Sequence, residues 1–318
     1  MNQAGNLAYD VFVNDPPPQD GFLPNGEPKR FSPMASTLIY GSEDAVLTDP
    51  GMTEDQARVL GDWVAAKDRN VTDIFITHGH GDHFFAAGLL AERFGARVVA
   101  TDGTIAQMHG SVATRPLLWD KLYPGLIPPS PVTAVTVPGN RLTVEGHDLV
   151  MVDVGHGDAE DNSVLHVPDL GLVVAGDVIY NRVHMYLGQS ATGGFGPWRE
   201  AIDKVEALGP RHIVCGHQDK RLDDDAKRTI GETRQYLDDA DELLRTEDTA
   251  AGYFNAKIAR YPDYLGQLIL WVTARALYGV RDALSVLDVA LAVLRLLPPL
   301  RRRVEGAARH ADDLLHVA

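Results

Sequence analysis

The sequence has little cysteine, no long uninterrupted apolar run and no excess of basic residues. Cys215 is the single cysteine among 318 residues, which excludes internal disulfide bonds and favours a reducing compartment. The formal net charge of −15 argues against a nucleic-acid partner, because phosphates require a basic surface. The most apolar stretch, Ala283–Leu297, is interrupted by Asp288 and Arg295 and is too short to span a bilayer. We therefore expect neither a nucleic-acid partner nor a membrane contact.

The first residues also lack the features of a secretion signal. Met1–Val13 contains neither a basic region nor an apolar segment. A hydrophobic content of 45% and a charged content of 23% are ordinary for a globular protein. We expect a cytoplasmic protein whose partner is a small-molecule substrate.

Turn residues and apolar periodicity predict an α/β chain followed by a helical one. Residues 14–33 are rich in proline, glycine and asparagine and predict an irregular arm. The main predicted elements before residue 224 are strands over 37–40, 45–48, 71–77, 149–154, 163–167, 172–175 and 212–215, and helices over 54–67 and 84–94. Helices are predicted over 225–245, 250–260, 264–277 and 281–297. We assign 1–224 to a catalytic domain with an N-terminal arm and 225–318 to a helical extension packed on it. The pattern leaves open whether these helices support a cleft or form a homodimer interface.

A cluster of potential metal ligands directly follows the predicted strand 71–77. Three histidines and one carboxylate fall within six positions, namely His78, His80, Asp82 and His83. The two glycines between them let the backbone fold back around an ion. The alternative is a polar loop with solvated histidines, which this density of ligand-type residues disfavours.

Three further ligand-type residues, His156, Asp177 and His217, each follow an apolar run and a glycine. Strand ends at one edge of a sheet converge, so these side chains can join the first cluster. A lone histidine after a strand is often an ordinary loop residue, and an aspartate after glycine is commonly a turn. Taken jointly, the residues predict a two-ion site. One ion would be held by His78, His80 and His156, the other by Asp82, His83 and His217, and Asp177 would bridge them. Mixed imidazole and carboxylate ligands suit two Zn²⁺, with Mn²⁺, Fe²⁺ and Co²⁺ as alternatives.

The motif from His78 to His83 resembles the HxHxDH signature of the metallo-β-lactamase superfamily. Gly155-His156, Gly176-Asp177 and Gly216-His217 occur in the order of that family's later ligands. Asp49 resembles the family's early structural aspartate, and the resemblance covers roughly residues 35–220. It implies an αβ/βα four-layer sandwich with a metal site at one sheet edge, closest in ligand set to the lactonase and glyoxalase-II-like branches.

A two-ion centre of this kind would generate a bridging hydroxide and polarise the bond under attack. Asp82 would orient the hydroxide and carry its proton to the leaving group. Tyr180 lies three residues after Asp177, the spacing at which lactonases of the family place a tyrosine that stabilises the developing oxyanion. The alternative is a tyrosine packed beneath the following loop.

The leading function is therefore hydrolysis of a lactone or small carboxylic ester. The same centre could instead cleave a thioester, a sulfate ester, a phosphodiester or a β-lactam. True β-lactamases of the family generally lack the bridging aspartate, and flavodiiron proteins have glutamate where His80 stands. Glyoxalase-type enzymes usually have glycines where Phe84 and Phe85 stand. A mononuclear iron oxidoreductase of the persulfide-dioxygenase type is the alternative from another enzyme class.

Overall fold

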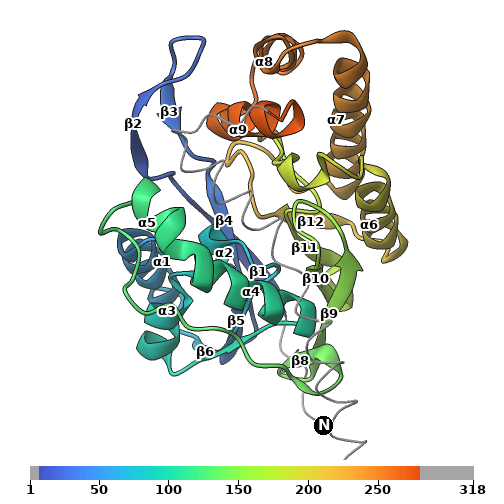
Figure 1. Cartoon of the computed structure of the whole chain (residues 1–318). Helices are drawn as coiled ribbons and strands as arrows, with labels where there is room; N and C mark the ends of the chain where they lie inside the picture. Colours follow the sequence, from blue (N-terminus) through green and yellow to red (C-terminus); the bar gives the residue numbers. More distant parts are fainter. Residues whose placement is uncertain (1–6, 280–318) are drawn as a thin grey trace, which may run out of the picture.

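Two five-stranded sheets form the centre of the computed structural model, which describes residues 7–279 (Figure 1). The strands of the first sheet, in the order β1-β4-β5-β6-β7, are β1 (Ala8–Asn14), β4 (Met34–Tyr40), β5 (Asp44–Thr48), β6 (Asn70–Phe75) and β7 (Arg97–Val99). Those of the second, in the order β12-β11-β10-β9-β8, are β8 (Arg141–Val144), β9 (His147–Gly155), β10 (Asn162–Val167), β11 (Leu172–Gly176) and β12 (His212–Cys215). The predicted helix 281–297 lies outside the described residues.

Each sheet contains parallel strands whose carboxyl ends reach the same edge. Strands β5, β6 and β7 are parallel neighbours, and so are β11 and β12. Helix α1 (Glu54–Ala65) connects β5 to β6, and α3 (Ala87–Phe94) precedes β7, as parallel strands require a crossover connection. The segments that follow β11 and β12 therefore reach one edge of the second sheet, and the segment after β6 lies beside this edge, where the Ser163 hydroxyl donates to the Thr77 carbonyl at 2.8 Å.

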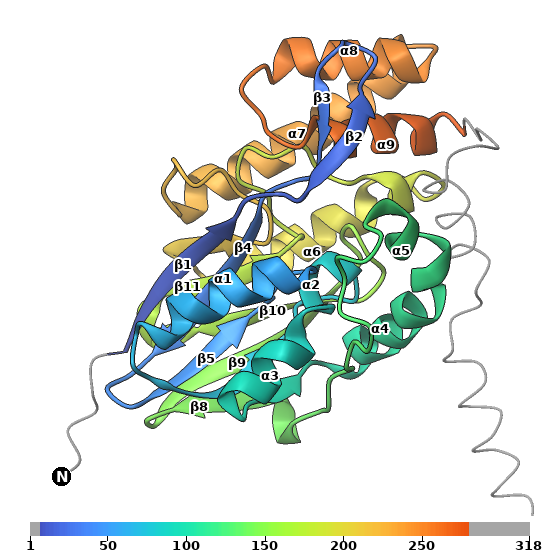
Figure 2. The same cartoon turned by 90° about the vertical axis from the view of Figure 1, so that its left-hand side faces the viewer.

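Helices cover the outer face of each sheet (Figure 2). Apolar side chains fill the space between the two sheets and form a core layer separate from those under the outer helices. Along β10, Val164 packs toward the helices while Leu165 packs between the sheets, because successive strand residues point to opposite faces. The outer helices are α1, α3 and α4 (Asp102–Thr114) on the first sheet, and α6 (Gly196–Ala207) and α7 (Ala226–Thr246) on the second. The architecture is the αβ/βα four-layer sandwich that the resemblance implied.

The N-terminal arm is more regular than its composition predicts. Strand β1 pairs with β4 along seven residues, and β2 (Pro18–Phe22) and β3 (Pro28–Arg30) form a separate hairpin. The prediction of an irregular arm was wrong for this hairpin, because its order depends on contacts with distant parts of the chain. One such contact is a hydrogen bond from Asn25 to Gln267 at 2.9 Å.

The helical extension also contains α8 (Ala250–Arg260) and α9 (Gln267–Leu277). Apolar residues of α7, α8 and α9 join the core on the outer face of the second sheet. Among the described helices, none is long and apolar enough to cross a membrane.

Candidate metal centre

Seven potential ligands converge where both sheets end. The loop after β6 and the short helix α2 (Gly81–Phe84) supply four of them, and the segments after β9, β11 and β12 supply one each. Their donor atoms form three overlapping groups, which are His78, His80 and Asp158; His78, His83 and Asp177; and Asp82, His83 and His217. Within each group the donor atoms lie within 4.8 Å of one another. The groups share His78 and His83 and are therefore one continuous cluster with two adjacent halves.

Two glycines allow the chain to approach this closely. A side chain at Gly79 would overlap Gln107 and lie 2.7–2.8 Å from backbone atoms of α4. A side chain at Gly216 would overlap Asp177 and lie 2.7 Å from Cε1 of His83. The glycines that precede these ligands are thus required by packing.

Hydrogen bonds fix which nitrogen of His78 faces the cluster. Its Nδ1 lies 3.1 Å from the Thr77 hydroxyl, which itself donates to Asp49 at 2.8 Å. Its Nε2 lies 3.3 Å from Oδ2 of Asp158 and is the atom available to an ion. A ligand histidine commonly has its second nitrogen held in this way, which fixes the tautomer and the ring orientation.

The two histidines in the other half of the cluster are oriented in a similar way. His83 has Nδ1 3.3 Å from Oδ2 of Asp49, and His217 donates from Nδ1 to the Pro33 carbonyl at 2.8 Å. The Nε2 atom of His217 lies 3.2 Å from Asp82 and 3.3 Å from Asp177. Both imidazoles therefore present Nε2 to an ion.

His80 is the most exposed of the four histidine ligands, with 19% of its side chain accessible. Its Nδ1 points inward, 2.7 Å from Oδ2 of Asp158. Its Nε2 lies 3.2 Å from the side-chain nitrogen of Gln189. With Nδ1 as the ligand atom, Nε2 carries the hydrogen, so we expect the Gln189 amide to turn its oxygen toward it. His80 is therefore the histidine of the cluster that is most accessible to solvent.

His156 does not belong to any ligand group found among the described residues. Its Nε2 lies 2.9 Å from the Ser190 hydroxyl, and Asp158 occupies the place predicted for it. The Asn162 amide donates to the carbonyls of Gly155 and Ala159 and so closes the turn that points Asp158 inward. Sequence reasoning missed Asp158 because two ligand-type residues stand two positions apart, and only the shape of this turn selects between them.

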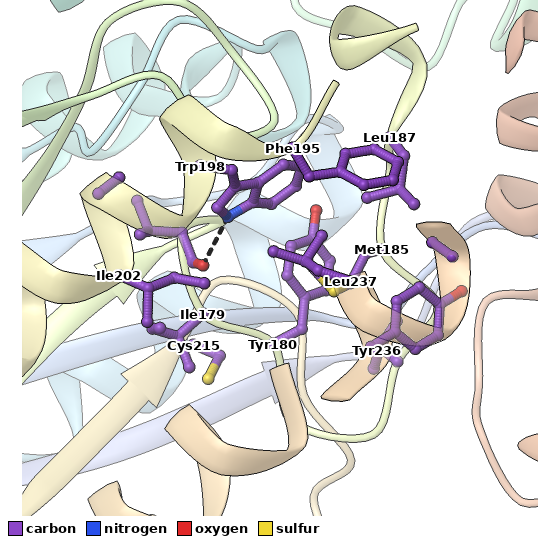
Figure 3. Packing of buried hydrophobic residues seen from close by; sticks show 14 of the residues in the cluster. Ile179, Tyr180, Met185, Leu187, Phe195, Trp198, Ile202, Cys215, Tyr236 and Leu237 are labelled. Carbon is purple, nitrogen blue, oxygen red and sulfur yellow. Dashed lines mark hydrogen bonds between the residues drawn. The ribbon is translucent and has the colours of Figure 1, made fainter. Parts of the chain in front are cut away.

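Asp177 lies between the two halves, as expected of a bridging ligand. Its oxygens are 3.5 Å from Nε2 of His83 and 3.3 Å from Nε2 of His217. The Tyr180 hydroxyl donates to Oδ2 of Asp177 at 2.7 Å. The ring of Tyr180 packs among Met185, Leu237 and Trp198, as Figure 3 shows. In this arrangement the phenol acts on Asp177, whereas its predicted contact with a substrate stays a prediction.

The electrostatics of the cluster suit a cation. Burial raises the pKa of the Asp177 carboxyl, but the neighbouring imidazoles of His217 and His83 hold it well below its usual range. Burial lowers the pKa of His217, yet Asp177 and Asp82 raise it to about 10. The buried carboxylates are thus stabilised by positive charge in the pocket, which a divalent ion supplies as the imidazoles release their protons.

Unsatisfied polar atoms provide an independent test of the fit to a metal ion. The Nε2 atom of His83, both carboxylate oxygens of Asp158 and Oδ1 of Asp177 are buried without a well-formed hydrogen bond to the described residues. Buried polar groups ordinarily have partners, and so many orphaned atoms at one point call for an ion. The residues present therefore fit a centre for divalent metal ions.

Comparison with known families gives the same assignment. The model of the metallo-beta-lactamase superfamily matches residues 31–217, which is more than half of the chain. The chain belongs to the metallo-beta-lactamase superfamily. Membership of this superfamily indicates a metal-dependent hydrolase and implies divalent metal ions, often zinc.

Individual relatives of the superfamily are distant. The chain is 25% identical to a metallo-beta-lactamase type 2 of Bacteroides fragilis over 192 residues, covering 59% of this chain and 70% of the relative. Among solved structures, a metallo-beta-lactamase family protein from Thermus thermophilus aligns with a TM-score of 0.56 and 20% identity, covering 86% of this chain and 93% of that one. A beta-lactamase domain protein from Burkholderia ambifaria aligns with a TM-score of 0.55 and 19% identity, covering 86% and 88%. These structures show the fold alone.

Replacing Tyr180 by phenylalanine tests what its hydroxyl does. The hydroxyl donates to Asp177, so the phenylalanine variant leaves this ligand without its hydrogen-bond partner. We expect the affinity of the centre for metal to fall by about tenfold or more, as is typical when a metal ligand loses such a partner. Competition with a metal-binding dye measures this. Unchanged metal affinity together with slower turnover would instead assign the hydroxyl to the substrate.

Proposed function

We propose that this chain is a dinuclear metal-dependent hydrolase that opens a lactone or cleaves a small carboxylic ester. The observation that carries the proposal is that the three ligand groups adjoin one another, because two ions held side by side require two adjacent ligand sets with a donor such as Asp177 between them. Two such ions would activate a water molecule at neutral pH and polarise the carbonyl under attack.

Asp82 is suited to handle the proton of the reaction. Its Oδ2 lies 3.2 Å from Nε2 of His217, within the second half of the cluster, and the side chain is almost fully buried. The neighbouring imidazoles outweigh the effect of burial and hold the pKa of Asp82 far below its usual range. A carboxylate that stays ionised can orient the attacking water and pass its proton to the leaving group.

The charge of the cluster favours a neutral substrate. Asp158 stands where a histidine was expected, so the centre carries three carboxylates, with Asp82 and Asp177 as the others. Beside two divalent ions the added negative charge lowers the net positive charge of the centre, which weakens attraction for a phosphodiester or a sulfate ester more than for a neutral ester. The acidity of the whole chain, with a net charge of −15, acts in the same direction.

Aromatic rings beside the second half of the cluster offer an apolar surface to such a substrate. The ring of Phe31 lies edge-on to His217, with centroids 6.2 Å apart, and contacts Trp119 and Tyr123 at 6.2 and 6.1 Å. Phe31 and Trp119 are only partly buried. These contacts support an acyl or lactone group with apolar substituents.

One observation favours a second candidate function. His78, His80 and Asp158 form a set of two histidines and one carboxylate, which is also typical of mononuclear iron(II) oxidoreductases. That function would leave Asp82, His83 and His217 largely without a role in metal binding. Metal content separates the two, because the hydrolase requires two ions per chain and the oxidoreductase requires one iron.

The decisive experiment offers metal-loaded protein a panel of lactone, carboxylic ester, thioester, aryl sulfate, phosphodiester and β-lactam substrates. We expect hydrolysis of the lactone or carboxylic ester, loss of activity with a chelator, and recovery on return of divalent metal. No turnover of any ester-like substrate by protein shown to contain two ions would refute the proposal.

A further inference from the structure

The two halves of the metal centre have the same donor composition. His78 and His80 are joined by Asp158 in one half, and the other half contains two histidines and Asp82. Asp177 lies between the halves and can serve both. Each ion would therefore have two imidazoles, one carboxylate of its own and one shared carboxylate, whereas the expected set with His156 would be unequal.

The placement of Asp158 identifies it as a ligand. The side chain is 1% exposed, and its Oδ2 lies 2.7 Å from Nδ1 of His80 and 3.3 Å from Nε2 of His78, the two nitrogens that face the cluster. Neither of its oxygens has a well-formed hydrogen bond to the described residues. A buried carboxylate without such bonds is costly unless an ion neutralises it.

His156 contacts a residue outside the ligand groups. Its Nε2 lies 2.9 Å from the hydroxyl of Ser190, in the loop between β11 and α6. Taking part in the metal centre would require this contact to break, and the turn that carries His156 is held by hydrogen bonds from Asn162 to Gly155 and Ala159. In this arrangement Asp158, and not His156, faces the other ligands.

We propose that Asp158 is the third protein ligand of the first ion, and that the centre consequently accepts two like ions of the Mn²⁺ or Fe²⁺ type more readily than a three-histidine set would. The reason is the donor chemistry, since imidazole nitrogen suits zinc and carboxylate oxygen suits harder ions such as Mn²⁺. This inference rests on the metal-dependent hydrolase proposed above and specifies its metal.

The test compares four proteins, which are the native chain, Asp158→Asn, Asp158→His and His156→Ala. Each is stripped of metal and titrated with Mn²⁺, whose free ion is followed by electron paramagnetic resonance, and then with Zn²⁺ in competition. The native chain should bind two Mn²⁺. Asp158→Asn should lose affinity for one of them by at least about tenfold. Asp158→His should raise the affinity for zinc relative to manganese by a similar factor, and His156→Ala should match the native chain.

Two results of these titrations would contradict the inference. Two Mn²⁺ bound with native affinity by Asp158→Asn, or loss of one ion in His156→Ala, would overturn the inference. Thermal unfolding of the metal-free proteins checks that each variant folds, and Asp158→Glu retains the carboxylate if asparagine weakens the fold. A native chain that binds metal as expected but cleaves no ester contradicts the proposed function alone. A chain that cleaves esters while Asp158→Asn retains both ions contradicts this inference alone.

Discussion

Replacing His83 by alanine is expected to remove one of the two metal ions and with it the activity. His83 belongs to two of the three ligand groups and is fully buried, so no other side chain can replace it without moving the chain. We expect the rate of ester hydrolysis to fall by at least about 1,000-fold, more than the loss of one hydrogen-bond donor from an oxyanion hole. Elemental analysis of the purified variant and its kcat/KM measure the two effects.

His109 provides the matched control for this variant. It is an exposed histidine on α4, outside the ligand groups. His109→Ala should retain both the metal content and the activity of the native chain. If His83→Ala were to keep two ions per chain, the assignment of the cluster as a two-ion centre would be wrong.

Replacing Asp49 by alanine is expected to weaken both the fold and the centre. Asp49 is fully buried and accepts hydrogen bonds from the backbone and hydroxyl of Thr77 at 2.9 and 2.8 Å. Leaving these two donors unsatisfied should lower the free energy of unfolding of the metal-free protein by about 2–4 kcal/mol. Metal affinity should fall as well, because Oδ2 of Asp49 lies 3.3 Å from Nδ1 of His83 and its negative charge favours the tautomer with the hydrogen there. Chemical denaturation and metal titration measure the two losses.

An Asp49→Asn variant distinguishes the effect of the negative charge from the effect of the backbone conformation. Asp49 has a φ of +41°, which asparagine tolerates far better than alanine. Asp49→Asn should therefore be more stable than Asp49→Ala, yet still lose metal affinity because a neutral amide oxygen attracts the Nδ1 hydrogen of His83 less strongly than a carboxylate does. Equal metal affinity in Asp49→Asn and the native chain would show that the carboxylate acts only on the fold.

The sequence was most informative where a pattern is local. Apolar periodicity predicted helices over 225–245 and 250–260, and the structure contains Ala226–Thr246 and Ala250–Arg260. The helix predicted over 84–94 was correct only in its second part, because the metal-binding turn starts a separate helix at Gly81. The strand that precedes His78 was also predictable, because β6 contains an apolar run and a polar turn follows it directly.

The sequence was least informative where distant residues decide the structure. Strand β1 depends on its pairing with β4, which its own composition does not reveal. The choice of Asp158 over His156 depends on the turn that Asn162 closes. The sequence left open whether Tyr180 contacts a substrate or packs beneath the following loop, and it did not reveal the hydrogen bond from the Tyr180 hydroxyl to Asp177. In each case the deciding interaction is a hydrogen bond that a linear pattern cannot encode.

The hydrogen bond between His217 and the Pro33 carbonyl has a consequence for how the protein folds. It joins residues 184 positions apart, and the ligands themselves come from loops after four different strands. Contacts with such long sequence separation form late, after the entropy of closing large loops has been overcome. We therefore expect the apoprotein to fold first and to acquire its metal afterwards, in contrast to small zinc domains whose ion nucleates folding.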